Sequence, residues 1–185
     1  DYIGKENLDP GDVIISTAPD ITGNHTSDAI LFTPIFFRDK IFGYAATKAH
    51  WIDLGAKSTY PADAVNIYEE GLRIPPVKLY KRGNLQSEIW EIINWNSRAP
   101  NQVWGDMQAQ IAGCRFAEKQ VTELLDKYGV ETVDAIIKEM YDYSERITRL
   151  AIEKIPDGTW TAEDYIDSNG IDLDKPILTK VTVMI

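Results

Sequence analysis

The chain has few of the residues that mark several large classes of protein. Its single cysteine, Cys114, cannot form an internal disulfide, and one free thiol fits a reduced, cytoplasmic setting. Basic residues are outnumbered, and the formal net charge of −10 argues against nucleic-acid binding, because such proteins carry a basic surface to meet phosphates. No apolar run is long and uncharged enough for a membrane helix. We therefore expect neither a nucleic-acid partner nor a membrane partner.

The residues that are present suit a globular protein. Hydrophobic side chains make up 44% of the chain and charged ones 26%, which is enough apolar material for a core. A length of 185 residues allows one domain or two small ones. Strand patterns fill the first half and helix patterns most of the second, so the sequence predicts an α+β fold.

The region 1–83 is predicted to be β-rich. Short runs of β-branched and aromatic residues indicate strands at 13–17, 28–37 and 40–51. Only a few polar residues around Asp39 separate the second run from the third, and so short a connection joins antiparallel neighbours. The sequence therefore predicts an antiparallel hairpin that turns near Asp39.

The region 84–156 is predicted to be helical. Ser87 is the expected cap of a helix of about three turns. Apolar residues then recur at helical spacing through 101–129 and again through 131–156. Gly129 between them suits a C′ position, so we expect two long helices that pack as an antiparallel helical hairpin.

The last region, 157–185, is predicted to begin a further β segment. The run "TAED" at 161–164 resembles a short helix start, and 176–185 has the pattern of a strand. A terminal strand needs partners, and we expect those of 176–185 to lie partly outside this chain. The chain would then be an excerpt of a longer subunit.

Both histidines of the chain are predicted to meet at one end of the hairpin. If the turn lies near Asp39, Asp28 faces His50 across the open end, and His25 lies three residues before Asp28. Two imidazoles and one carboxylate form a facial ligand set for a divalent metal with open positions. Asp53 is close enough in sequence to orient His50 from behind. The alternative is that the histidines are ordinary polar loop residues and that Asp53 is a solvated aspartate.

Several blocks of the sequence resemble one known family. "PGDVII", "GNHTSDAILFTPIF", "AHWIDLGAK", "NIYEEGLRIPPVKLY" and "GDMQAQIAGCR" occur in the order found in the hydantoinase B/oxoprolinase family, which includes the metal-binding subunit of acetone carboxylase. The resemblance runs from about Tyr2 to Gly129 and continues more weakly to the end. Subunits of that family are considerably longer than this chain.

The resemblance implies a metal and a partner. In the acetone carboxylase relatives an H-x-x-D pair and a later histidine hold manganese, and His25, Asp28 and His50 match these positions; other members are described with zinc. Family members work with a hydantoinase A-like ATPase subunit, which would bind the ATP. This chain agrees, because it has no phosphate-binding G-x-x-x-x-G-K-[ST] loop. One departure is Ala18, where many members have an aspartate; Asp20 lies near but not in that position.

The run 52–83 offers a second candidate element. Long loops inside compact domains are often functional, although a plain surface connection is more common. Arg73 could bind a phosphorylated intermediate or a substrate carboxylate. The alternative is a local ion pair between Glu70 and Arg73, and Lys78 is expected to be structural.

The resemblance implies three functions. The first is a subunit of an ATP-dependent hydrolase of cyclic amides, of the hydantoin or 5-oxoproline type, with a divalent metal in the small-molecule substrate site. The alternative is the metal-binding subunit of an acetone-type carboxylase. The third is a scaffold whose metal site is vestigial, which only Ala18 favours. All three imply a hetero-oligomer.

Overall fold

The computed structural model describes residues 2–23 and 25–185, and the chain divides into two compact units at Lys127/Tyr128. Strands dominate the first part of the chain and helices follow, so the predicted α+β class is confirmed. The finer boundaries predicted after residues 83 and 156 stay predictions. No helix among the described residues is long and apolar enough to cross a membrane.

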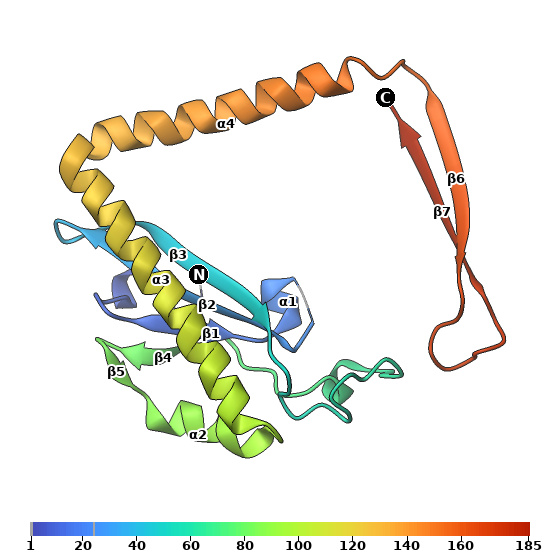
Figure 1. Ribbon diagram of the computed structural model, residues 1–185, viewed down its shortest axis with the longest axis horizontal. Coiled ribbons are helices and arrows are strands. Elements are labelled where there is room, and N and C mark those ends of the chain that lie inside the picture. The colour runs from blue at the N-terminus through green and yellow to red at the C-terminus, as the bar shows by residue number, and fades with distance from the viewer. Residues whose placement is uncertain (1, 24) are drawn as a thin grey trace. The chain divides into compact units, whose positions relative to one another are not determined.

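A five-stranded antiparallel sheet forms the centre of the first unit (Figure 1). The strand order is β3-β2-β1-β4-β5. The strands are β1 (Val13–Ser16), β2 (Asp28–Phe37), β3 (Lys40–His50), β4 (Val77–Lys81) and β5 (Asn84–Leu85). Short segments that connect or flank them are η1 (Lys5–Asn7), α1 (Pro19–Thr22) and η2 (Ile67–Glu69).

The predicted hairpin is confirmed with its register. β2 pairs with β3 so that Asp28 lies opposite His50, and the same register holds as far as the pair Ile35 and Gly43, where a bulge shifts it. Arg38 and Asp39 form the two-residue turn, with φ values of 48° and 63°. Two central residues with positive φ are the signature of a type I′ turn, whose twist matches that of the flanking strands.

One face of the sheet is covered by helices α2 (Ser87–Asn96) and α3 (Pro100–Tyr128). Ala29 and Leu31 of β2 are fully buried against this layer, which contributes Met107 from α3 and Ile93 from α2. Burial of one such large side chain is worth about 1.5 to 3 kcal/mol. This apolar layer fixes the strands whose ends carry the polar residues described below.

α3 approaches strand β3 closely at a small residue. A Cβ added at Gly113 would lie 3.4 Å from Cγ2 of Thr47, so a larger side chain there would press on the sheet. The next residue, Cys114, is buried as predicted, and its thiol donates to the carbonyl of Leu31 at 3.6 Å. Burial raises the pKa of the Cys114 thiol, which keeps it protonated and unreactive.

Two local predictions in this unit are wrong. The two prolines before residues 77–81 and Gly83 after them predict a loop, but the alternation of Val77 and Leu79 with polar residues forms β4. β4 pairs with β1, and burial of Leu79 outweighs the turn signals around it. Ser87 is the first residue of α2 rather than its cap: Gln86 occupies the cap position, without a side-chain cap bond.

The second unit contains α4 (Val130–Ile152), β6 (Thr159–Ile166) and β7 (Ile177–Met184). β6 and β7 pair antiparallel along their whole length, so the predicted terminal strand exists and one partner lies within the chain. The helix start predicted at 161–164 is wrong, because those residues lie in the middle of β6. Cross-strand pairing of aromatic and β-branched residues decides the conformation here, and the short capping pattern does not.

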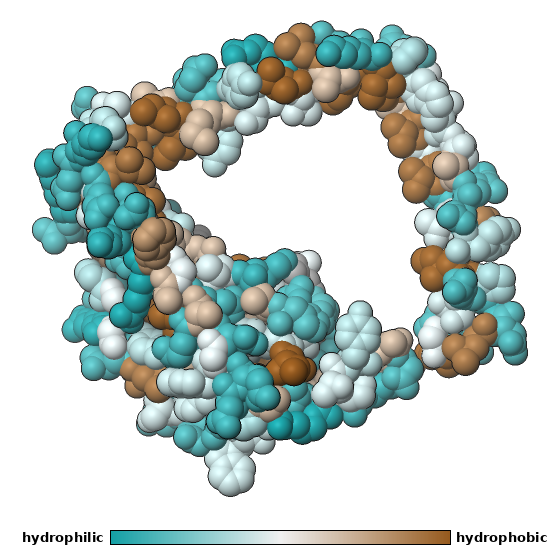
Figure 2. Space-filling model, viewed as in Figure 1, coloured by the Kyte–Doolittle hydropathy of each residue, from teal (hydrophilic) through white to brown (hydrophobic). Residues whose placement is uncertain are grey.

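The two long helices are confirmed, and their packing as an antiparallel helical hairpin stays a prediction, because almost all of α3 belongs to the first unit and α4 to the second. α4 buries no residue, and Ile136, Met140 and Ile147 of its apolar stripe are all exposed. Figure 2 shows hydrophobic side chains recurring along α4. Gly129 has φ 80° and ψ 155°, which lies outside the left-handed helical region that a C′ glycine adopts. Periodicity revealed the apolar stripe but not what covers it.

Candidate metal centre

The end of the β2–β3 hairpin is built by backbone pairing. Asp28 is the first residue of β2 and His50 the last of β3, and the ladder places them opposite each other. The chain just before β2 folds back over this end, because the N–H of Asp28 donates to the carbonyl of His25 at 3.1 Å. The buried Trp51 anchors the end of β3: its N–H donates to Ser27 O at 2.8 Å. The strand ladder therefore positions Asp28 and His50, and backbone hydrogen bonds hold the segment that carries His25 beside them.

Three side chains converge on one point, as the sequence predicted. Nε2 of His25 lies 2.9 Å from Nδ1 of His50, and Oδ1 of Asp28 lies 3.0 Å from Nδ1 of His50 and 3.3 Å from Nε2 of His25. Three ligands on one face of an octahedral ion with bonds of about 2.1 Å would be about 3 Å apart. The observed triangle has this size, so the donor set fits a divalent cation.

The site is open to solvent on one side. The side chains of His25 and His50 are 46% and 44% exposed, and that of Asp28 is 21% exposed. Two imidazole nitrogens 2.9 Å apart can share only one proton between them in their neutral forms, and a cation between them would satisfy both lone pairs. An exposed triad also leaves coordination positions for water or substrate.

A pocket of about 500 Å³ adjoins the two histidines. The loop segment Thr59–Ala62 and Glu70 line it, together with Ser27. Ser27 and Glu70 lie in two of the sequence blocks that resemble the family, but no such block contains Thr59–Ala62. The signal that could have found them is the length of the loop 52–83, because long loops in compact domains often line binding sites.

Asp53 lies against an arginine rather than behind His50. Its buried carboxylate accepts bonds from the backbone N–H and the guanidinium of Arg98, with Nε to Oδ2 at 3.0 Å, and from the N–H of Gly55 at 3.2 Å. The Arg98 hydrogen bond lowers the pKa of Asp53, although desolvation opposes it. Asp53 therefore ties the loop after β3 to the start of α3, and none of its bonds within the described residues goes to His50.

Arg73 is also paired, but not with Glu70. Its Nη2 lies 2.7 Å from Oδ1 of Asp20, and this hydrogen bond lowers the pKa of the Asp20 carboxyl. The guanidinium also stacks over the Tyr68 ring at 5.8 Å. Ala18, in the place where many family members have an aspartate, is buried at the start of α1. The Asp20 carboxylate is thus paired with Arg73.

Lys78 has the structural role predicted for it. Its Nζ lies 2.6 Å from Oδ2 of the buried Asp12 and also donates to the carbonyl of Asn7. Asp12 in turn accepts from the N–H of Arg82 at 2.8 Å. These bonds hold the N-terminal segment against β4, which is separated from the β2–β3 hairpin by β1 in the order of the sheet.

The whole chain, residues 1–185, matches the family model Hydantoinase B/oxoprolinase, and the chain belongs to this family. It is 38% identical over 175 residues to the B subunit of a "Putative D-/L-hydantoinase" of Pseudomonas sp. (strain NS671), covering 93% of this chain and 29% of that protein. It is 34% identical over 180 residues to the beta subunit of the caprolactamase of Pseudomonas jessenii, covering 96% of this chain and 31% of that protein.

Solved structures agree with the fold. The crystal structure of the ATP-dependent caprolactamase from Pseudomonas jessenii superimposes with a TM-score of 0.80 at 35% identity, over 89% of this chain and 29% of that chain. A nucleotide-free structure of acetone carboxylase gives 0.76 at 22% identity, over 90% of this chain and 22% of that chain, which supports the fold alone. The chain spans about three-tenths of the length of the hydantoinase and caprolactamase subunits named above.

Proposed function

We propose that this chain supplies the metal centre of an ATP-dependent hydrolase of cyclic amides, with His25, Asp28 and His50 as the ligands. The observation that carries the proposal is the triangle of donor atoms, with edges of 2.9, 3.0 and 3.3 Å, beside a pocket of about 500 Å³ that both histidines line. Mixed nitrogen and oxygen donors suit zinc or manganese.

A divalent ion held there would polarise a substrate carbonyl or lower the pKa of a bound water. The chain's own contribution is to hold the three donor atoms in place. Asp28 supplies the negative charge, and the two histidines must present neutral nitrogens toward the ion. The hairpin ladder fixes the separation of Asp28 and His50, and the pocket receives the substrate beside them.

The reaction is inferred from relatives. Two relatives, at 38% and 34% identity, are named as parts of a hydantoinase and of a caprolactamase, and both names denote opening of a ring amide. Because both names describe one component of a larger enzyme, we propose that this chain works in a hetero-oligomer with an ATPase subunit of the hydantoinase A type. That partner would bind the ATP, and the assembly would work in the cytoplasm.

The carboxylase alternative has weaker support. The chain is 22% identical to the delta subunit of acetophenone carboxylase of Aromatoleum aromaticum, and to acetone carboxylase in the structural comparison. Identity this low supports the shared fold. Closer identity to the ring-amide enzymes is the observation that favours hydrolysis.

Metal analysis tests the proposed centre. Purified wild type should carry about one divalent ion per chain, and His50→Ala should lose most of it. Lys48→Ala is the matched control, because Lys48 belongs to the same strand and is not one of the three proposed ligands. Equal metal content in wild type and His50→Ala would contradict the proposal.

Nucleotide turnover tests the reaction. With its partner subunit the protein should hydrolyse ATP when hydantoin or 5-oxoproline is added, and not when acetone is added. Without the partner, the chain should not hydrolyse ATP. Stimulation by ketones alone would favour the carboxylase, and stimulation by neither class would remove support from both.

A further inference from the structure

Glu70 lines the pocket, and its carboxylate is not bound to any other residue in the described part of the chain. Among the described residues that line the pocket, it carries the only carboxylate. Its backbone is fixed at the end of η2, where its N–H donates to the carbonyl of Ile67 at 3.2 Å. Its side chain forms no hydrogen bond or ion pair with any described residue, so the carboxylate is available to a ligand.

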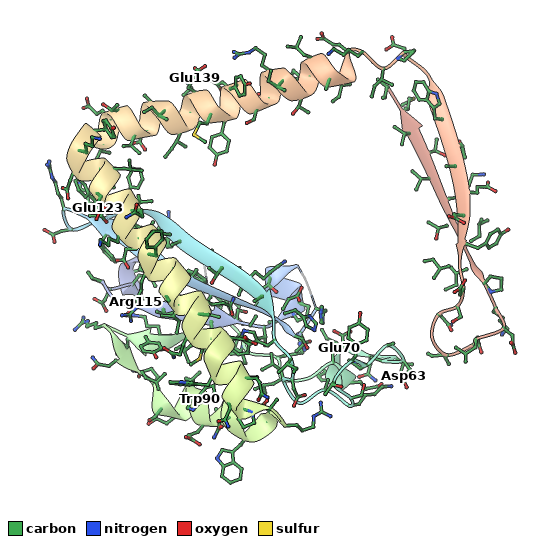
Figure 3. All side chains as sticks on the ribbon, in the orientation of Figure 1. Asp63, Glu70, Trp90, Arg115, Glu123 and Glu139 are labelled. Atoms are coloured by element: carbon green, nitrogen blue, oxygen red, sulfur yellow. The ribbon has the colours of Figure 1, made fainter. Side chains whose placement is uncertain are left out.

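The neighbouring acidic residues are occupied. Nζ of Lys57 lies 2.8 Å from Oε2 of Glu69 and 3.1 Å from Oδ2 of Asp63. These hydrogen bonds raise the pKa of Lys57 and lower those of both carboxyls, so all three groups stay charged at neutral pH. Figure 3 labels both Glu70 and Asp63 on the loop that follows β3. Two carboxylates of the loop are thus paired with Lys57, whereas Glu70 lines the pocket.

The pocket has three kinds of wall. The histidines of the metal centre lie at one side, Glu70 provides a hydrogen-bond acceptor, and Tyr60, Pro61 and Ala62 provide apolar surface. A ring amide has matching parts: a carbonyl oxygen and an N–H held cis to each other on one edge, and a hydrocarbon ring behind them. The pocket's volume lies in the usual range for small-molecule sites.

We propose that Glu70 determines specificity by accepting a hydrogen bond from the ring N–H while the carbonyl oxygen is directed to the metal centre. This inference rests on the proposed function. A carboxylate acceptor favours rings that carry an N–H over N-alkylated rings of the same size, because the latter leave the charged oxygen without a partner. Since Glu70 is partly exposed, we expect a preference of about tenfold rather than the larger factor of a fully buried site.

Binding of two small lactams tests this without turnover. The metal-loaded, full-length protein with its partner subunit, in the absence of ATP, would be titrated with 2-pyrrolidinone and with N-methyl-2-pyrrolidinone, followed by ligand-observed NMR. The variants are Glu70→Met, which removes the acceptor, and Glu70→Gln, which keeps a neutral one. Asp63→Leu is the control, because it removes a carboxylate from the same loop while Lys57 keeps its bond to Glu69.

We expect wild type and Asp63→Leu to bind 2-pyrrolidinone about tenfold more tightly than the N-methyl compound. Glu70→Met should lose this preference, and Glu70→Gln should keep part of it. An undiminished preference in Glu70→Met, or no binding of 2-pyrrolidinone by wild type, would overturn the assignment. Metal analysis of the same samples separates the two claims. If Glu70→Met binds metal and still prefers 2-pyrrolidinone as wild type does, only the role of Glu70 is contradicted. If wild type binds no metal, both the proposed function and this inference are contradicted.

Discussion

At the scale of single residues, Asp28 holds the most constrained position of the metal centre. Its Oδ1 lies 3.0 Å from one imidazole nitrogen and 3.3 Å from the other, and it is the least exposed of the three ligands. It is also the one proposed ligand with a negative charge, and a divalent ion would lose most when that charge is removed.

Replacing this charge should release the metal while the fold remains. We expect Asp28→Asn to weaken binding of zinc or manganese by at least about a hundredfold, because even outer partners of metal ligands cost 10- to 100-fold when changed. Competition with a coloured chelator measures the affinity, and circular dichroism checks the fold. Asp20→Asn, an aspartate paired with Arg73 instead, should bind metal as wild type does.

The pair Asp53–Arg98 gives a stability prediction. Asp53 has no exposed side-chain surface, so Arg98→Met leaves a buried charge without its partner and should destabilise the protein by about 3 kcal/mol at neutral pH. Arg82→Met, which removes an exposed pair with Asp9, should cost less than about 1 kcal/mol. Urea unfolding measures both; equal effects would contradict the assigned role of Asp53.

The same pair predicts a dependence on pH. The pKa of Asp53 in the folded protein is lowered, chiefly by the Arg98 hydrogen bond, so its stabilisation is complete above the unfolded value of about 4. This stabilisation is lost as the pH falls through the lower pKa that Asp53 has in the folded protein. The stability difference between wild type and Asp53→Asn should therefore be constant near neutrality and shrink below about pH 4.

The sequence was sufficient for some of these residues and not for others. His25, Asp28 and His50 could be brought together because strand pairing is a simple rule once the turn is located. The partner of Asp53 could not be predicted from the sequence, because Arg98 lies 45 residues later and no periodicity links the two residues. Contacts that loops make depend on the folded surface, and adjacency in sequence suggested His50 instead.

At the scale of elements, the β2–β3 hairpin is the part of the molecule on which the site depends. Both turn residues, Arg38 and Asp39, have positive φ. Residues other than glycine lose about 1 to 2 kcal/mol each in that conformation. The hairpin keeps its register in spite of this cost, because a slip by one residue would expose Leu31 and Ala29.

A better turn should stabilise the protein and leave the metal in place. Replacing Arg38 and Asp39 by Asn-Gly, the preferred type I′ pair, should raise the free energy of unfolding by about 1 kcal/mol. Metal affinity should not change, since Asp28 and His50 stay in register. Thermal unfolding with and without metal measures both quantities. A loss of affinity in this variant would mean that the turn influences the site directly.

Element prediction succeeded where one pattern dominated. Strands β2 and β3 and helices α3 and α4 are long and strongly periodic, and they occur where expected. β4 and β6 were missed because proline, glycine or a capping pattern gave an opposing local signal. β4 forms by pairing with β1, which is distant in sequence, and β6 forms by pairing with β7, the next strand of the chain.

At the scale of the whole molecule, the two units differ in how much they bury. The core clusters lie in the unit that ends at Lys127, and no residue of Tyr128–Ile185 is buried. The α+β class could be predicted because it needs only the order of patterns along the chain. The exposure of α4 could not be predicted, because an amphipathic pattern does not show which surface packs against its apolar side.

Metal removal should therefore affect one unit and not the other. A ligand that binds only the folded form stabilises it by about 2.7 kcal/mol at a hundredfold excess over Kd. Hydrogen exchange after chelation should rise for the amides of β2 and β3, and stay unchanged for β6 and β7. Equal changes in both units would contradict a metal centre confined to the hairpin end.

The most direct test of the metal centre is the position of the ion itself. Anomalous diffraction from crystals grown with zinc or manganese should show one peak about 2.1 Å from Nε2 of His25, Nδ1 of His50 and Oδ1 of Asp28. The remaining positions should face the pocket that Glu70 lines. A peak elsewhere in the chain, or ligand atoms of these three residues too far apart to share one ion, would contradict the account.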